Sequence, residues 1–249
     1  MKVCSLFSGI GGIDLGFQQA GFDIVWANEI DKYASDTYEY NFGSESLVRG
    51  NIKKIDVSNI PEYDILVAGF PCQAFSTAGK QRGFDDDRGD LFFQVARVVE
   101  ATTPKVIFLE NVKNFASHDG GNTLKVVEAT LDELGYDVFY KVLNSVDYGM
   151  PQKRERIYII CFRKDLKITN FEFPKPFPLH RHVEDFVEEN SLVKPFEETK
   201  YKNVFATCVP NKAELLTADT WYMLSTILDT YEKENTNLNL QFKIVEIIK

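Results

Sequence analysis

Apolar residues form short runs that alternate with segments of helical spacing over most of the chain before residue 163. Short apolar runs bounded by turn residues predict buried strands, and apolar positions three or four residues apart predict helices. Strands are predicted at residues 2–7, 22–28, 64–69, 105–110, 137–144 and 156–162, and helices at 12–20, 31–40, 90–101 and 122–134. This alternation predicts an α/β fold with a doubly wound, mostly parallel sheet and helices on both faces.

The pattern changes after residue 163. Residues 171–182 read FEFPKPFPLHRH and carry three of the nine prolines, and the alternation of strands and helices does not resume. Apolar spacing predicts one helix at 212–234, and the final FKIVEIIK predicts a short strand. We therefore predict one domain over residues 1–163 and a short, irregular C-terminal region over residues 164–249.

Composition narrows the class of protein. With 44% hydrophobic and 26% charged residues among 249, the chain has the composition of a folded globular protein. No apolar run approaches the roughly 20 residues that span a bilayer, and the N-terminus lacks the layout of a signal peptide, so we expect a cytoplasmic location. The four cysteines are scattered, which supports neither a disulfide framework nor a metal site. The net charge of −9 means that any nucleic-acid contact must come from a local basic patch or a partner.

The first two strands end in residues suited to a nucleoside ligand. Gly9, Gly11 and Gly12 lie between the first strand and the first helix, where glycine lets a ligand approach the backbone closely. Glu29 follows the second strand, about 20 residues later, and suits hydrogen bonds to ribose hydroxyls. Together these residues favour an adenosine-containing cofactor, although the glycines alone fit a tight turn equally well. The absence of GxGxxG spacing argues against a dinucleotide.

The third strand ends in GFPCQAFSTAG, which presents Cys72 directly after Pro71. A structural cysteine usually lies within an element, whereas this one borders the long polar segment 73–89, as a reactive thiol would. Loops of that length between a strand and a helix are usually functional or mobile. A structural role for Cys72 is the alternative.

Candidate acid and basic groups follow the later strands. Glu110 leaves a buried strand, where burial would raise its pKa into a useful acid range; an ordinary solvated glutamate is the alternative. A polar and basic cluster precedes the last strand: Gln152, Lys153, Arg154 and Arg156. Strand spacing puts Arg154 and Arg156 on one side, suited to phosphate or base contacts, although a solvated run of charges has the same sequence pattern.

These motifs occur in one order along the chain, as FSGIGG, GFPCQAFS, ENV and QKRERIY. In that order and at these separations, the sequence resembles the DNA (cytosine-5)-methyltransferases, closely over residues 1–163. The resemblance implies a Rossmann-like fold, S-adenosylmethionine as cofactor and duplex DNA as substrate. It also implies that the target cytosine is flipped out of the duplex and that Cys72 attacks its C6.

The resemblance implies a role for each candidate residue. The S-adenosylmethionine pocket would be lined by Phe7, Gly9, Gly11, Gly12 and Pro71, with Glu29 on the ribose and Ile30 against the adenine. Catalysis would use Cys72 as nucleophile, Glu110 at N3 of cytosine, and Arg156 with Arg154 at the base. DNA contacts would come from Ser76, Gln81 and Arg88 in a closing loop and from Gln152. Asn51 stands where the family often has an aspartate facing the adenine amino group, and its oxygen can still accept that hydrogen bond.

The region after residue 163 departs from the family pattern. It carries no recognisable target-recognition domain and no GN-containing motif that normally completes the cofactor domain. We therefore expect a second polypeptide to supply these parts, and bacterial restriction-modification is the expected setting. The alternatives are an inert fragment that binds cofactor or DNA, a non-enzymatic interaction module, and cytosine-5 methylation of tRNA.

Overall fold

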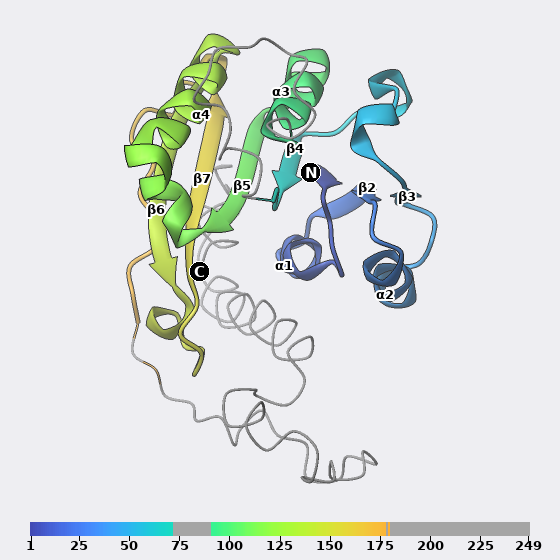
Figure 1. The fold of residues 1–249 in the computed structure, drawn as a ribbon, viewed down its shortest axis with the longest axis horizontal. Helices are drawn as coiled ribbons and strands as arrows, with labels where there is room; N and C mark the ends of the chain where they lie inside the picture. Colours follow the sequence, from blue (N-terminus) through green and yellow to red (C-terminus); the bar gives the residue numbers. More distant parts are fainter. Residues whose placement is uncertain (72–90, 178, 180–249) are drawn as a thin grey trace, which may run out of the picture.

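A computed structural model of the chain describes residues 1–71, 91–177 and 179, and its centre is a seven-stranded sheet (Figure 1). The strands are β1 (Lys2–Leu6), β2 (Asp23–Glu29), β3 (Leu47–Arg49), β4 (Ile65–Ala68), β5 (Val106–Val112), β6 (Tyr136–Asn144) and β7 (Glu155–Arg163). Their order across the sheet is β3-β2-β1-β4-β5-β7-β6. Of these strands, β7 alone runs in the direction opposite to the other six. The predicted mostly parallel sheet is therefore confirmed.

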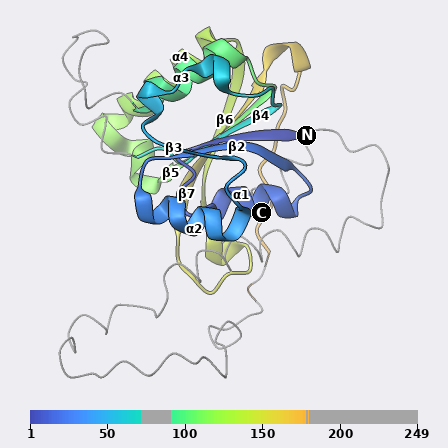
Figure 2. The same ribbon diagram turned by 90° about the vertical axis from the view of Figure 1, so that its right-hand side faces the viewer.

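Helices cover both faces of the sheet. Helices α1 (Gly12–Gln19) and α2 (Lys32–Phe42) lie on one face, and α3 (Leu91–Thr102) and α4 (Asn122–Glu133) lie on the other (Figure 2). The alternation of side chains along β4 explains why both faces need cover: Leu66 and Ala68 join the core under α3 and α4, whereas Ile65 and Val67 join the other core. The predicted doubly wound, Rossmann-like architecture is confirmed.

Two strands differ from the sequence prediction by more than one residue at an end. The edge strand β3 was not predicted, because its three residues are too few to show an apolar pattern. Strand β5 continues to Val112, two residues beyond the predicted end, so Glu110 lies within the strand. Short 3-10 turns also occur: η1 (Ile52–Lys54), η2 (Val57–Asn59), η4 (Lys113–Gly121), η5 (Ser145–Asp147) and η6 (Lys164–Leu166).

The first residues after position 163 pack against the sheet. The ring of Phe171 is buried against Phe139 and Phe162, and Phe177 forms a β-bridge with Tyr148. Apart from residue 179, the rest of the predicted C-terminal region lies outside the described residues, so the boundary at 163/164 stays a prediction. Within residues 1–71 and 91–177, no helix is long and apolar enough to cross a membrane.

A buried carboxyl group joins α1 to the sheet. Asp14, in the first turn of α1, is 1% exposed and accepts a hydrogen bond of 2.6 Å from the hydroxyl of Ser5 in β1. Burial raises the pKa of Asp14 from 3.8 to about 6, and the hydrogen bond from Ser5 partly opposes this rise. The folded chain therefore holds this proton more tightly than the unfolded chain does.

We predict a pH-dependent stability that disappears in Asp14→Asn. Between about pH 4 and pH 6 the folded chain binds a proton that the unfolded chain has released, so the free energy of unfolding falls as pH rises through this window. Each pKa unit corresponds to about 1.4 kcal/mol. Between pH 4 and pH 7 the free energy of unfolding of the wild-type chain should therefore fall by roughly 3 kcal/mol relative to that of Asp14→Asn. Urea unfolding of both proteins across this range measures the difference. A difference that does not change with pH would contradict the buried, protonated carboxyl.

Candidate active site

The loop between β1 and α1 is held in an unusual backbone conformation. Phe7, Gly9 and Gly11 have φ values of 55°, 58° and 91°, in the left-handed region that strains an ordinary side chain such as that of Phe7. A methyl group on Gly11 would collide with the ring of Phe42 in α2, so this position requires glycine. At Gly9, by contrast, the space that a side chain would fill is open. The loop thus leaves room for a ligand beside Gly9. Helix α1 begins three residues later, at Gly12.

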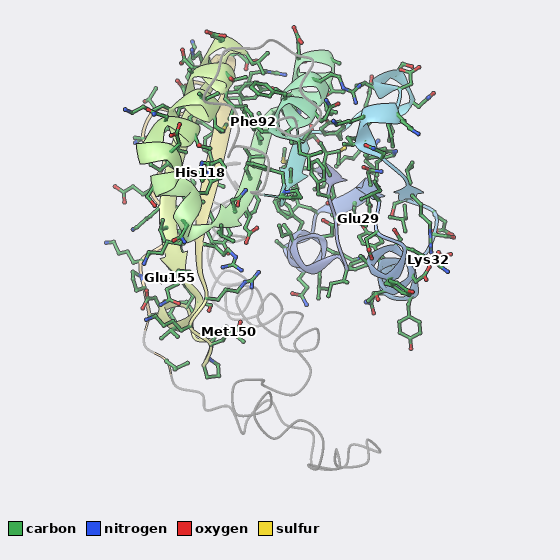
Figure 3. The ribbon with its side chains drawn as sticks, in the orientation of Figure 1. Glu29, Lys32, Phe92, His118, Met150 and Glu155 are labelled. Carbon is green, nitrogen blue, oxygen red and sulfur yellow. The ribbon has the colours of Figure 1, made fainter. Side chains whose placement is uncertain are left out.

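Glu29, at the end of β2, ties this loop to the neighbouring strand. One carboxylate oxygen accepts the backbone N–H of Gly9 at 2.8 Å, and the other accepts those of Ile30 and Asp31 at 2.8 and 2.7 Å. Glu29 is buried, and Figure 3 places it close to α2. Ile30, directly after it, is 65% exposed. The predicted loop, acid and apolar residues therefore lie together at the carboxyl ends of β1 and β2, where ligands bind in sheets of this kind.

The end of the edge strand β3 is fixed beside Glu29. The amide of Asn28 donates to the carbonyl oxygens of Val48 and Gly50, at 2.8 and 3.0 Å. Asn51 follows, and its side-chain oxygen accepts the N–H of Lys53 at 3.0 Å, which caps the turn η1. The same oxygen keeps a second lone pair for a ligand.

The acid Glu110 and the cation Arg156 meet on neighbouring strands. Glu110 Oε1 lies 2.9 Å from Arg156 Nε, and the two side chains are only 19% and 21% exposed. Burial raises the pKa of Glu110 above its ordinary value, while the positive charges of Arg156 and Arg154 oppose that rise. Gly69, after β4, lies beside this carboxylate, since a Cβ atom there would be 3.6 Å from Glu110 Oε2, an ordinary van der Waals contact. The carboxyl group can therefore donate or accept a proton beside a fixed cation.

Asn111 connects Glu110 to the segment that leads to Cys72. Its side chain is buried, and its amide donates to the carbonyl oxygen of Phe70 at 2.8 Å, while its oxygen accepts the N–H of Val112 at 2.9 Å. Phe70 is itself buried, and the next residue, Pro71, is exposed. Asn111 lies in the ENV motif, directly after Glu110. Its bond across to the end of β4 joins residues 41 apart, a contact that no local pattern reveals.

The remaining predicted site residues divide into two groups. Arg154 precedes β7 and donates its backbone N–H to Asn144 at 3.0 Å. Because its positive charge opposes the rise in the pKa of Glu110, as that of Arg156 does, both predicted arginines lie near Glu110. The side-chain oxygen of Gln152 is buried and has no partner within the described residues. Figure 3 places Glu155, between the two arginines, near the lower end of β6 and β7. Four predicted residues lie outside the described residues: Cys72, Ser76, Gln81 and Arg88.

No group of three or more histidine, cysteine, aspartate or glutamate side chains that could hold a metal ion occurs in the described ranges. The arrangement instead combines two halves along one edge of the sheet. The carboxyl ends of β1, β2 and β3 offer a glycine loop, an acid and an exposed apolar residue. The ends of β4 and β5, with the start of β7, offer a partly buried acid, two arginines and the approach to Cys72. Such a site can hold a nucleoside-containing cofactor beside an acid–base centre.

Comparison with known proteins identifies the family. A model of the C-5 cytosine-specific DNA methylases matches residues 1–246. The Type II methyltransferase M.HhaI of Haemophilus parahaemolyticus is 55% identical over 194 residues, which cover 78% of this chain and 59% of that protein. M.NgoBI of Neisseria gonorrhoeae is 50% identical over 194 residues, covering 78% of this chain and 60% of that protein. The chain thus spans about 60% of the length of these relatives.

Solved structures agree with this assignment. A mutant of Spodoptera frugiperda DNMT2 superimposes with a TM-score of 0.64 and 26% identity, covering 76% of this chain and 60% of that one. A putative DNA modification methyltransferase encoded within an Escherichia coli prophage gives a TM-score of 0.61 and 29% identity, covering 72% of this chain and 51% of that one. The predicted resemblance and the predicted fold of S-adenosylmethionine-dependent methyltransferases are confirmed. The chain belongs to the C-5 cytosine-specific DNA methylase family.

Proposed function

We propose that this chain transfers a methyl group from S-adenosylmethionine to C5 of a cytosine that is flipped out of duplex DNA, with Cys72 as nucleophile. The observation that carries the proposal is the partly buried pair of Glu110 and Arg156, 2.9 Å apart. Asn111, next to Glu110, binds the backbone at Phe70, two residues before Cys72. Family membership and the names of the relatives, which are Type II methyltransferases, support it. Bacterial restriction-modification is the proposed setting, and a cytoplasmic location is proposed with it.

The residues at the ends of β1, β2 and β3 fit the cofactor. The open space beside Gly9 leaves room for it, Glu29 has carboxylate oxygens for the ribose hydroxyls, and exposed Ile30 offers an apolar surface to the adenine. Asn51 is available to the adenine edge. Bound S-adenosylmethionine supplies an electrophilic methyl group. The chain's own part is to bind the nucleoside, exclude water and activate the cytosine.

Activation of the cytosine requires a nucleophile and a proton source. In the proposed reaction the Cys72 thiolate adds to C6, and Glu110 supplies a proton at N3 as negative charge develops in the ring. C5 thereby becomes nucleophilic. After methylation, the C5 proton passes to water, Cys72 leaves C6 as the thiolate, and the N3 proton returns to Glu110, which restores the aromatic ring. Arg156 orients Glu110 and, with Arg154, supplies positive charge beside the base.

Glu29 provides a prediction for the cofactor half. In Glu29→Gln the amide nitrogen that replaces one carboxylate oxygen would face an N–H donor, either that of Gly9 or those of Ile30 and Asp31. We expect Kd for S-adenosylmethionine to rise at least roughly tenfold, because Glu29 loses a charge-assisted hydrogen bond from one of these backbone N–H groups. Isothermal titration calorimetry measures the affinity, with Asp31→Asn, which alters the cap of α2, as the control. Equal affinity of Glu29→Gln and wild type would contradict the role of Glu29.

The proposal extends to DNA and to a partner. We propose that a second polypeptide supplies target recognition, since the net charge of −9 favours a basic partner for phosphate contact. The test measures labelled methyl transfer to mixed-sequence duplex DNA and to tRNA, by the chain alone and with the product of an adjacent gene. Transfer to DNA that requires the added polypeptide supports the split enzyme, and transfer by the chain alone contradicts it. Transfer to tRNA only, or to neither substrate, contradicts DNA methylation by this chain.

A further inference from the structure

The segment from Gly50 to Ile55 borders the place where the base of a bound nucleoside would lie. Moving outward across the sheet, the glycine loop ends β1, Glu29 ends β2, and Gly50 follows β3. The N–H of Gly50 donates to the carbonyl oxygen of Glu29 at 2.8 Å. A nucleoside whose ribose meets Glu29 therefore presents its base to the residues after β3. The position of this segment decides whether the base is held.

One side chain of α3 binds this segment on the face of the sheet where Ile52 is buried. Arg97 of α3 donates from Nη2 to the carbonyl oxygen of Ile52 at 2.8 Å and from Nη1 to that of Ile55 at 3.3 Å. Its Nε donates to Gln94 at 3.0 Å, which fixes the guanidinium plane. These carbonyl groups belong to Ile52, the first residue of the turn η1, and to Ile55, its C-terminal cap. The bonds join residues 45 and 42 positions apart.

The turn is thus held from both ends. Asn51 caps its first N–H groups, and Arg97 binds its carbonyl groups. Ile52, between them, is buried in the core under α3. Without the guanidinium, the carbonyl group of Ile55 would lose its bond from Arg97, and that of Ile52 would keep only the N–H of Ile55 within the turn. The turn would then be free to shift. Any shift of η1 also moves Asn51, which directly precedes it.

We propose that Arg97 is a positioning residue for the cofactor, which fixes the segment Gly50–Ile55 against the adenosine half of S-adenosylmethionine. The inference rests on the proposed function. The hydrogen bonds of Arg97 go to Gln94, Ile52 and Ile55, and none of these residues has a role in the proposed chemical step. Its effect should therefore fall on cofactor affinity and leave the chemical step nearly unchanged.

Arg163 provides a matched control. It too is a partly exposed arginine whose guanidinium binds a backbone carbonyl, that of Thr103, while its Nε is fixed by Asp165. It lies at the far end of β7, where the preceding residue, Phe162, pairs with Val106 at the start of β5, and so away from the cofactor edge of the sheet. Loss of Arg163 should reduce stability through the same kind of bond and leave the cofactor site intact.

The test compares Arg97→Met, Arg97→Lys and Arg163→Met with wild type. Calorimetry gives Kd for S-adenosylmethionine and for 5′-methylthioadenosine, which keeps the adenosine and lacks the amino-acid part, and steady-state kinetics give KM and kcat. For Arg97→Met we expect Kd for both ligands, and KM for the cofactor, to rise about tenfold, with kcat within about threefold of wild type. Arg97→Lys keeps one donor group, so its Kd values should lie between those of wild type and Arg97→Met. Arg163→Met should bind both ligands with the affinity of wild type.

Three results would overturn the inference alone: unchanged Kd in Arg97→Met, a loss confined to kcat, or an equal rise of Kd in Arg163→Met, which would indicate general destabilisation. A wild-type chain that binds neither ligand overturns the proposed function, and the inference with it. The two failures are distinguishable because calorimetry on wild type is independent of DNA and of methyl transfer.

Discussion

Replacing Glu110 with glutamine should lower kcat for methyl transfer by roughly 10²- to 10⁴-fold, the range typical for loss of a general acid. The amide is nearly isosteric with the carboxyl group, so it can still accept from Arg156, but it cannot give a proton to N3 of cytosine. Cofactor affinity should stay near that of wild type, because Glu110 lies beyond the residues assigned to the nucleoside. Single-turnover methyl transfer to duplex DNA, with the partner chain if one is required, measures this step.

Glu155→Gln is the control for Glu110→Gln. Glu155 begins β7 directly before Arg156 and pairs with Lys113 at 2.7 Å, but it is more exposed than Glu110 and faces a surface lysine. The same chemical change there should alter kcat by less than about threefold, since exposed ion pairs contribute little. A kcat for Glu110→Gln within about threefold of wild type would contradict the assigned role of Glu110.

The pH profile should also change with Glu110. Burial raises the pKa of Glu110, so the acid keeps its proton to higher pH. The positive charges of Arg156 and Arg154 oppose that rise. In the wild type the rate should therefore fall on the alkaline side as Glu110 loses its proton. In Glu110→Gln that alkaline limb should disappear.

Asn111→Leu should lower kcat by about 10²-fold, because a displacement of about 1 Å in a catalytic group can cost that much. Leucine is of similar size but cannot donate to the carbonyl oxygen of Phe70, so the end of β4 loses its tie to β5 two residues before Cys72. The buried carbonyl left without a donor should also reduce the free energy of unfolding by roughly 1–3 kcal/mol. Single-turnover kinetics and urea unfolding measure the two effects separately.

Tyr136→Phe separates the two effects of Asn111→Leu. The hydroxyl of Tyr136 donates to the carbonyl oxygen of Pro104 at 2.6 Å, a buried side-chain bond just before β5 begins, at the opposite end from the site. Its removal should cost similar stability and leave kcat unchanged. If Tyr136→Phe slowed methyl transfer as much as Asn111→Leu does, the effect of Asn111 would be one of stability alone.

The sequence was sufficient to predict the elements that local patterns encode. The apolar runs of β1, β2, β4 and β5 and the glycines before α1 follow from strand and turn chemistry, and Glu29 follows from its spacing after those glycines. The alternation of strands and helices then predicted that these residues meet at one edge of the sheet. The contact between Glu29 and Gly9 is consistent with that prediction.

Contacts between distant residues were not predictable in the same way. The bonds from Asn111 to Phe70 and from Arg97 to Ile52 join residues more than 40 positions apart and depend on how α3 and β5 pack. The edge strand β3 escaped prediction because its pairing with β2, rather than its own composition, makes it a strand. Gly69 reads as an ordinary turn residue, and only the fold shows that a side chain there would contact Glu110.

The most direct test of the proposed chemistry is covalent capture on duplex DNA that contains 5-fluorocytosine, in the presence of S-adenosylmethionine. Fluorine at C5 cannot leave as a proton does, so an adduct between Cys72 and C6 should persist after methyl transfer and survive denaturing electrophoresis. We expect a stable protein–DNA species with wild type, none with Cys72→Ser, and a slower one with Glu110→Gln. Methylation of ordinary cytosine by wild type without any Cys72-dependent adduct would contradict the account.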